Sequence, residues 1–339
     1  METPDMDGTT LTTASLVEVE DLMVRFVSRD ATLHAVNGVS FSVKPGQVLG
    51  ILGESGFGKS VILRALMRLL PKGRTKISGK VSLCGEDVLA MDKKRLRQLR
   101  GGLVSMIFQE PMTALDPVYT VSQQIVETIR HHRRGSHTEA RRRALDLFEL
   151  VKIPSPERRL DAYPHELSGG LRQRAMIAMA LSCGPKLLLA DEPTTVLDAT
   201  VQIQVLILPR RLQSELGMGT IFVTHDLGVA AEIADRIAVM YAGRIVEEGP
   251  MANILANPRH PYTQGLLAST VHGQDRAHDI NAIGGSPPAM RRLPSRCSFG
   301  PSCANAENHV SRCFSARYPT GARPDRPLLA RIIAAEQLP

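Results

Sequence analysis

Apolar and polar residues alternate along Leu16–Val27 and Val39–Val43, a period of two that is typical of strands with one buried face. Residues 47–52 form a short apolar run that leads into a glycine-rich loop. Residues 61–70 then follow a helical pattern, which stops at Pro71. The beginning of the chain therefore predicts strands, a loop and a helix in that order.

Further short apolar runs predict buried strands at Leu103–Phe108, Lys186–Ala190, Thr220–Val223 and Ile237–Met240. The last three are separated by helical stretches, so we expect an α/β fold whose core is a parallel sheet built from β-α-β units.

The segment between Pro111 and Pro164 has a helical composition instead of strand patterns. Ser136 and Glu139 have capping-box spacing ahead of a predicted helix over 140–151. The strand and helix patterns become less regular after Pro250, and prolines and arginines dominate from residue 286 onward. We expect a helical insertion in the core and a small, loosely structured C-terminal appendage.

The composition is that of a globular protein with enough apolar material for a large core: 339 residues, 43% hydrophobic and 22% charged. The best candidate for a membrane span, residues 175–190, is broken by Gly184, Pro185 and Lys186, and Met1–Ser15 does not resemble a secretory signal. These features favour a cytoplasmic protein.

The net charge of +7 favours an acidic partner. We nevertheless expect the six arginines of Arg130–Arg143 to form a solvated helix face.

A phosphate-binding motif of the form G-x-x-x-x-G-K-[ST] lies between the predicted strand and helix and consists of Gly53, Glu54, Ser55, Gly56, Phe57, Gly58, Lys59 and Ser60. Backbone N–H groups of such a loop point at phosphates, and the positive end of the helix dipole lies beside them. Lys59 would neutralise phosphate charge, and the Ser60 hydroxyl would bind Mg²⁺.

Two carboxylates follow the apolar run 187–190, where the carboxyl end of a parallel strand would place them beside a ligand. We expect Asp191 to support the Mg²⁺ ligand shell. Glu192 would orient or deprotonate an attacking water molecule. Asp-Glu pairs often occur by chance on protein surfaces. This pair follows four apolar residues and lies downstream of a P-loop, so we favour a functional role over a chance surface pair.

Leu167-Ser168-Gly169-Gly170-Leu171-Arg172-Gln173-Arg174 resembles the signature that, together with a P-loop, marks the ATP-binding-cassette (ABC) family. The resemblance covers about Leu16 to Gly249. It identifies Gln109 as the Q-loop glutamine, Asp198 as the D-loop aspartate and His225 as the switch histidine. It implies that Gln109, Glu192 and His225 act in catalysis, that Ser60, Gln109 and Asp191 surround Mg²⁺, and that Ser168, Gly169, Gly170 and Asp198 help to hold ATP.

The same resemblance implies an α/β fold with a RecA-like P-loop core, an ABC β-subdomain and a helical subdomain over about 111–168. The expected domains are a disordered N-terminus over 1–15, a nucleotide-binding domain over 16–250 and a C-terminal extension over 251–339. Ser168 would begin a second helix whose N-terminus can bind an anion. One nucleotide hardly needs both this helix start and the P-loop from the same chain. The family resolves this by placing ATP between the P-loop of one subunit and the signature of another.

Four further motifs are similar to those of the oligopeptide, dipeptide and nickel importer ATPases: 108–117, 163–166, 190–195 and, most discriminating, His260-Pro261-Tyr262-Thr263. The similarity implies a peripheral protein on the cytoplasmic face of the inner membrane that powers uptake of peptides or a related small solute. The implied partners are a second, paralogous ATPase, two permease subunits and an extracytoplasmic binding protein, without nucleic acid. The alternative is a soluble ABC ATPase that acts on nucleic acid or ribosomes, which the basic charge favours mildly.

The chain departs from the subfamily pattern at Phe57, where serine is usual, at Val196 and at Pro209, where we expect a kinked helix. Phe57 occupies a variable position of the motif and should not block phosphate binding. No residue is clearly placed to stack on adenine, and the candidates are Phe26 and His34.

The tail of related importers can carry four cysteines that bind an iron–sulfur cluster, whereas this tail contains Cys297, Cys303 and Cys313. Val310 stands where a third ligand is expected. His309 is a candidate substitute, and the resulting set of three cysteines and a histidine would also suit zinc. We favour three reduced thiols and predict no stable cluster.

Overall fold

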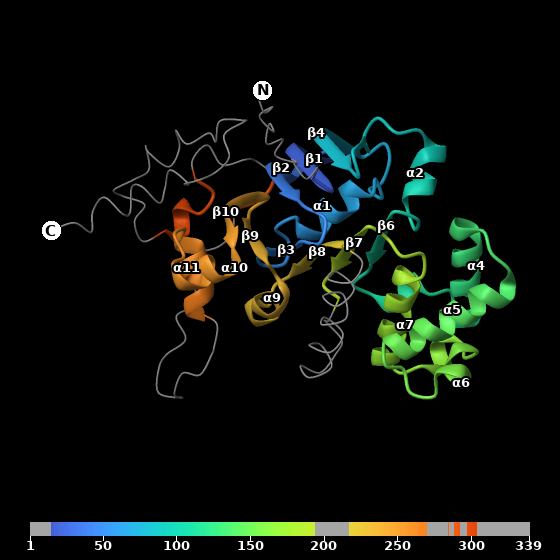
Figure 1. Ribbon diagram of the computed structural model, residues 1–339. Helices are drawn as coiled ribbons and strands as arrows, with labels where there is room; N and C mark the ends of the chain where they lie inside the picture. The colour runs from blue at the N-terminus through green and yellow to red at the C-terminus, as the bar shows by residue number, and fades with distance from the viewer. Residues whose placement is uncertain (1–14, 194–216, 270–283, 285–287, 292–296, 304–339) are drawn as a thin grey trace, which may run out of the picture.

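The computed structural model describes residues 15–193, 217–269, 284, 288–291 and 297–303, which form two β-sheets and the helices packed around them (Figure 1). The smaller sheet is antiparallel, with the strand order β2 (Thr32–Val43), β1 (Val17–Val27), β4 (Thr75–Leu83) and β5 (Glu86–Asp87). The larger sheet has the order β10 (Arg244–Pro250), β9 (Arg236–Tyr241), β3 (Val48–Leu52), β8 (Gly219–Thr224), β7 (Leu187–Asp191) and β6 (Val104–Ile107).

The larger sheet is parallel from β9 to β6, and β10 joins it antiparallel to β9. The parallel core expected from the sequence is therefore confirmed. Leu187 and Leu189 of β7 are buried in a core shared with α1 (Lys59–Leu66) and the smaller sheet. Leu188 lies in the other core, with the helices of the insertion. Alternate side chains of one strand thus enter two cores, which explains why the strand is continuously apolar.

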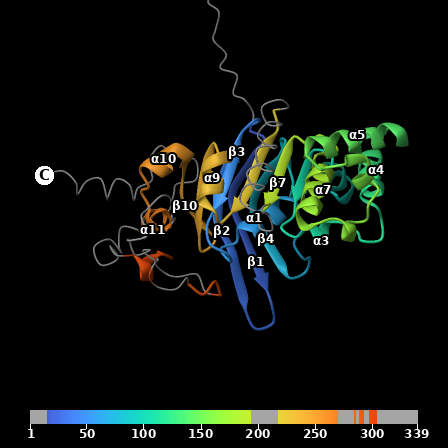
Figure 2. The same cartoon turned by 90° about the horizontal axis from the view of Figure 1, so that it is seen from below.

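The insertion after β6 is helical, as expected, and its helices are α3 (Pro111–Ala114), α4 (Val121–Arg133), α5 (His137–Leu150), α6 (Pro156–Leu160), the short η1 (Pro164–Glu166) and α7 (Gly169–Leu181). Ser136 and Glu139 form the capping box predicted at the start of α5: the Ser136 hydroxyl accepts the Glu139 N–H at 3.2 Å, and the Glu139 carboxylate accepts the Ser136 N–H at 2.9 Å. Figures 1 and 2 place α4, α5 and α7 together beyond β6.

Part of the arginine run 130–143 packs on neighbouring elements, so the expectation of a solvated helix face is incomplete. Arg133 Nε donates to the Cys183 carbonyl at 3.0 Å, and Arg143 Nε donates to the Ser182 carbonyl at 2.5 Å. These carbonyls lie at the end of α7, where cations complement the helix dipole. The arginines therefore tie α4 and α5 to α7.

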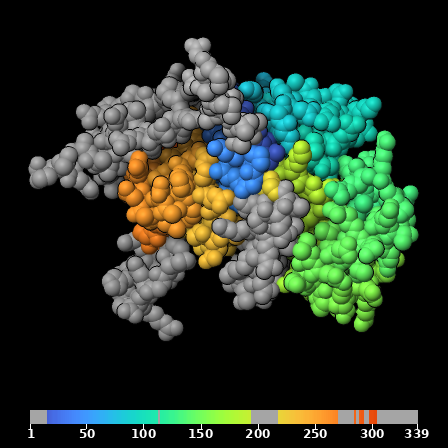
Figure 3. Space-filling view, in the orientation of Figure 1, coloured from blue at the N-terminus to red at the C-terminus, as the bar shows by residue number. Residues whose placement is uncertain are grey.

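Two helices follow β10, where the sequence predicted a loss of regularity: α10 (Met251–Ala256) and α11 (Pro261–Ser269). That expectation is wrong for these residues. The turn between the helices is fixed because the Glu247 carboxylate accepts the N–H groups of Arg259 at 2.8 Å and His260 at 2.9 Å. With η2 (Gly300–Ser302), these helices lie at one end of the molecule, and the insertion lies at the other (Figures 2 and 3). The short α2 (Lys93–Leu99) and α9 (Leu227–Ile233) complete the described helices.

Candidate active site

The loop 53–58 joins β3 to α1 and lies close to the backbone of two strands, β2 and β9. Gly58 has φ 90°, and a Cβ there would come within 2.1 Å of the Ala35 carbonyl oxygen on β2. A Cβ on Gly53 would lie 2.3 Å from the Met240 carbonyl oxygen on β9. Only glycine fits these two contacts, so the glycines of the motif serve the close packing of the loop as well as its shape.

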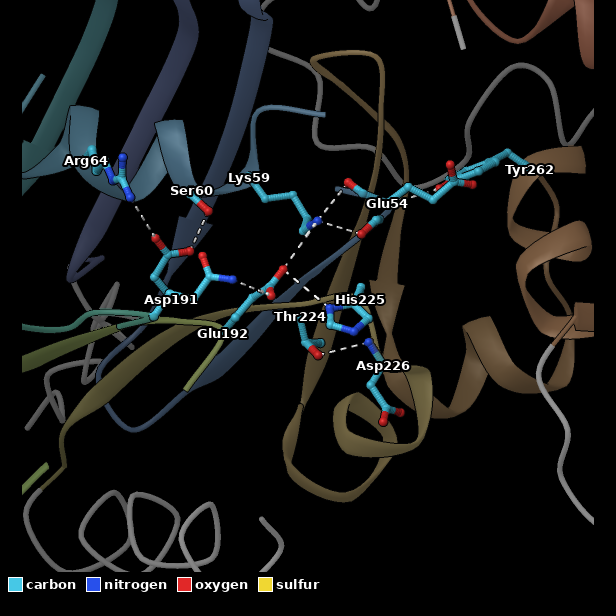
Figure 4. Close-up of polar contacts among 12 residues, drawn as sticks. Glu54, Lys59, Ser60, Arg64, Asp191, Glu192, Thr224, His225, Asp226 and Tyr262 are labelled. Atoms are coloured by element: carbon cyan, nitrogen blue, oxygen red, sulfur yellow. Dashed lines mark hydrogen bonds and ion pairs between the residues drawn. The ribbon is translucent and has the colours of Figure 1, made fainter. Parts of the chain in front are cut away.

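Lys59, the first residue of α1, is buried against this loop, with 4% of its surface exposed. Its ammonium group donates to the carbonyl oxygens of Gly53 at 2.6 Å and Glu54 at 2.8 Å (Figure 4). Burial lowers the pKa of Lys59, and the carboxylates of Glu192 and Asp191 oppose that effect. A buried ammonium group of this kind is stabilised by an arriving anion such as a phosphate.

Asp191 ends β7 and is fully buried, and its Oδ1 accepts the Ser60 hydroxyl at 2.5 Å. Its Oδ2 is buried without a hydrogen bond from the described residues, and the nearest cationic group is Arg64, at 3.8 Å. Burial raises the pKa of Asp191. A hydroxyl and an orphaned carboxylate oxygen side by side are hard oxygen donors, and this set fits Mg²⁺.

Glu192 lies where side chains from several elements converge. Gln109 Nε2 donates to its Oε2 at 3.1 Å. His225 Nδ1 lies 3.4 Å and Lys59 Nζ 3.9 Å from its Oε1 (Figure 4). The backbone of Glu192 has φ 43°, a left-handed conformation that is uncommon for a non-glycine residue, and its N–H donates to the Val223 carbonyl. A carboxylate in this position can accept a proton from a water molecule held at the loop.

The order of the parallel strands explains the convergence. Because β3, β8, β7 and β6 are neighbours in the sheet, their carboxyl ends lie on the same edge. The P-loop follows β3, His225 follows β8, Asp191 ends β7 and Glu192 follows it, and Gln109 follows β6. His225 is further positioned by Asp226, whose carboxylate caps α9 by accepting two backbone N–H groups at 2.7 and 3.1 Å.

Ser168, Gly169 and Gly170 lie apart from this convergence. Ser168 is the N-cap of α7, and its hydroxyl accepts the Leu171 N–H at 3.4 Å. Figures 1 and 2 place α7 with the other helices of the insertion, whereas the P-loop leads into α1. The structure thus forms the predicted second helix start but does not bring it to the P-loop of its own chain.

Some residues that the sequence singled out lie outside the part of the chain that the structure describes, and two others are described without a clear role. Asp198, Val196 and Pro209 lie outside the described residues. Phe26 packs partly buried against the core, and the His34 ring has a buried Nδ1 without a hydrogen bond from the described residues, so neither is distinguished as the residue that stacks on adenine.

The tail cysteines are described in part. Cys297 and Cys303 are partly exposed and pack against a small aromatic cluster, while Cys313, His309 and Val310 lie outside the described residues. Within the described segments, no group of three or more His, Cys, Asp or Glu side chains could hold a metal ion. The expectation of three reduced thiols stays a prediction.

Sequence reasoning missed two residues that touch the P-loop region. The Tyr262 hydroxyl accepts the Glu54 N–H at 3.3 Å, and Arg64 lies beside Asp191. Tyr262 belongs to the motif 260–263, but that pattern carries no signal for where the side chain goes. Phe57, interpreted as a variable position, is 4% exposed and packs against Tyr241 and Tyr262.

Comparisons with protein families match two regions of the chain. A profile described as ABC transporter matches residues 36–195. A profile described as the C-terminal region of oligopeptide/dipeptide transporters matches residues 246–309.

Individual proteins are similar over most of the chain. A peptide import ATP-binding protein of Brucella abortus is 48% identical over 326 residues, covering 88% of this chain and 96% of that protein. A peptide ABC transporter ATP-binding protein of Sinorhizobium fredii is 48% identical and covers 85% of this chain and 87% of its own length. Among solved structures, a dimeric ATP-binding cassette bound to ADP and Pi has a TM-score of 0.63 at 28% identity, with coverage of 69% of this chain and 98% of that one.

Proposed function

This chain belongs to the ABC transporter family as one of its ATP-binding subunits, and we propose that it hydrolyses ATP to power the import of peptides across a membrane. The ATPase assignment is carried by one observation: Lys59, Gln109 and His225 converge on the Glu192 carboxylate beside a P-loop. The peptide assignment is supported by 48% identity with proteins named for peptide import and by the match of the C-terminal region.

We assign the chemistry of hydrolysis to residues at the edge of the sheet. The P-loop N–H groups and Lys59 hold the phosphates, and Glu192 accepts a proton from the water molecule that attacks the γ-phosphorus. The bond between that phosphorus and the β-phosphate oxygen breaks as the new P–O bond forms. Gln109 orients Glu192 through its amide, and His225 contacts the γ-phosphate. Most of the catalysis is therefore positioning and charge stabilisation.

Ser60 and Asp191 are the residues that would hold Mg²⁺, and we assign Gln109, which contacts the adjacent Glu192, to the same site. The ion supplies positive charge to the phosphate oxygens when it is bound. Asp191 supports this role because burial leaves its Oδ2 without a hydrogen bond from the described residues while the Ser60 hydroxyl occupies its Oδ1. Among the described ion pairs, the cationic partner of that oxygen is the Arg64 guanidinium, 3.8 Å away.

The active unit in this proposal contains two cassettes. Ser168, Gly169 and Gly170 begin α7, away from the P-loop of the same chain, so a bound ATP would need this helix start from a partner. The similar solved cassette with ADP and Pi is dimeric. Asp198, which lies outside the described residues, is assigned to the same interface, and we propose a paralogue as the second cassette.

Transport would require membrane-spanning partners. No helix in the described ranges is long and apolar enough to cross a bilayer. We propose that two permease subunits form the path, that an extracytoplasmic binding protein delivers the solute, and that this chain sits peripherally at the cytoplasmic face of the inner membrane. Nucleic acid has no role in the proposal.

Peptide uptake tests the proposed function in cells. Cells are given an isotope-labelled mixture of di- to pentapeptides. We expect cells that lack this chain to fail to take up some of these peptides, and we expect expression of the chain to restore their uptake. Free amino acids in the same assay serve as the control and should enter equally in both strains. Unchanged uptake of every labelled peptide would contradict the peptide assignment and leave the ATPase assignment to the turnover experiments below.

A further inference from the structure

A small aromatic cluster beside β9 and α11 includes a residue of the P-loop. Phe57 packs edge-on against Tyr241 of β9, with ring centroids 4.8 Å apart, and lies 6.2 Å from Tyr262 of α11. Tyr241 and Tyr262 are 4.7 Å apart, and Phe299 is 5.2 Å from Tyr241 and 5.6 Å from Tyr262. We call these four rings, Phe57, Tyr241, Tyr262 and Phe299, the aromatic clamp.

The clamp touches the P-loop backbone as well as its side chain. The Tyr262 hydroxyl accepts the N–H of Glu54 at 3.3 Å, and Gly243, two residues after Tyr241, donates its N–H to the Phe57 carbonyl at 3.2 Å. The loop is therefore attached at Glu54, near its beginning, and at Phe57, near its end. Both attachments come from residues that are distant in the sequence.

Tyr262 is placed firmly. Its side chain is fully excluded from solvent, with 0% of its surface exposed. The backbone N–H of Tyr262 donates to His260 Nδ1 at 3.1 Å. Burial lowers the pKa of His260 to about 4, so this ring stays neutral and Nδ1 remains an acceptor. Burial and the Glu54 carboxylate raise the pKa of Tyr262, which keeps its hydroxyl protonated. Its hydroxyl is directed at the loop, where it accepts the Glu54 N–H (Figure 4).

A phosphate-binding loop works through the directions of its N–H groups, and an untethered glycine-rich loop would have to be ordered when the nucleotide binds. Gly56 and Gly58 both have positive φ, and nothing lies within 4 Å of where a Gly56 Cβ would stand. The loop is thus open at Gly56, and the contacts at Glu54 and Phe57 hold it on either side.

We propose that Tyr262 and Phe299 are positioning residues that hold the P-loop in its phosphate-binding conformation, so that the segment after β10 contributes to ATP affinity. The proposal rests on the proposed role of the P-loop in holding ATP. The two residues act in different ways. Tyr262 contacts the loop directly, whereas Phe299 acts through Tyr241 and Tyr262. The hydrogen bond of Tyr262 and the ring contacts of both residues lead to the P-loop, so we expect the clamp to act on nucleotide binding.

Isothermal titration of the full-length chain with magnesium AMP-PNP tests the proposal. Tyr262→Phe keeps the ring and removes the acceptor of the Glu54 N–H, and we expect its Kd to rise about 2- to 10-fold, the effect of one hydrogen bond. Phe299→Leu should raise the Kd in the same direction by a smaller factor. Tyr119→Phe is the matched control, because Tyr119 is 54% exposed on the helical insertion, and its Kd should equal that of the unchanged chain.

The titration separates positioning from a general loss of folded protein. Positioning raises the Kd while the binding stoichiometry per chain stays constant, whereas partial misfolding lowers the stoichiometry and leaves the Kd alone. An unchanged Kd for both Tyr262→Phe and Phe299→Leu, at either full or reduced stoichiometry, would overturn the clamp. Absence of AMP-PNP binding by the unchanged chain would instead contradict the proposed function on which the clamp rests.

Discussion

Replacing Glu192 with glutamine is expected to lower ATP turnover by about 10²–10⁴-fold, the usual contribution of a general base, while ATP binding is retained. The amide keeps the size of the side chain but cannot accept the proton of the attacking water. ATP should therefore remain bound and hold two cassettes in a closed dimer. Phosphate release and the amount of nucleotide that stays with the dimer after gel filtration measure the two effects.

Glu20→Gln is the matched control, because Glu20 is 62% exposed on β1 and pairs only with another surface residue, Lys80, in the described ion pairs. We expect this control to hydrolyse ATP at the unchanged rate. Rapid hydrolysis by the Glu192→Gln chain, in an assembly whose partner site is also disabled, would remove Glu192 as the catalytic base.

Lys59→Ala is expected to act on binding instead, raising the Kd for ATP about 10- to 100-fold, as loss of a hydrogen bond from a charged group does. Lys59 also donates to the carbonyls of Gly53 and Glu54, so its removal loosens the start of the loop. Titration with magnesium AMP-PNP measures the change in Kd.

Lys80→Ala serves as the control for Lys59→Ala, because Lys80 is 54% exposed and pairs with Glu20 at the surface. Surface ion pairs contribute little, and this variant should bind nucleotide like the unchanged chain. An equal Kd for Lys59→Ala and Lys80→Ala would show that the Lys59 ammonium does not hold the phosphates.

The sequence predicted the fold, and it pointed to several residues that the structure brings together in the candidate site, because the relevant signals are local. The P-loop residues are contiguous, and Asp191 and Glu192 directly follow the apolar run 187–190. Once the strands are parallel, their carboxyl ends meet at one edge, so the approach of Gln109 and His225 to Glu192 follows from the fold. The capping box at Ser136 is another local signal that the structure confirms.

Contacts between distant segments could not be predicted in the same way. Tyr262 is 208 residues from Glu54 in the chain, and no pattern in either segment pairs them. Phe57 looked like an unconstrained position because the P-loop motif specifies only its glycines, lysine and hydroxyl. Likewise, Arg133 and Arg143 resembled a solvated charge run, since the carbonyl groups they reach become available only where α7 ends.

The central claim is that two cassettes complete one another's ATP sites, and ATP turnover per chain over a wide dilution range tests it most directly. Ser168–Gly170 lies away from the P-loop of its own chain, so we predict that the isolated chain is a weak ATPase. Turnover per chain should rise with concentration, and again when the partner cassette and the permeases are added. Full turnover that is independent of concentration, from a chain shown to be monomeric, would contradict the account.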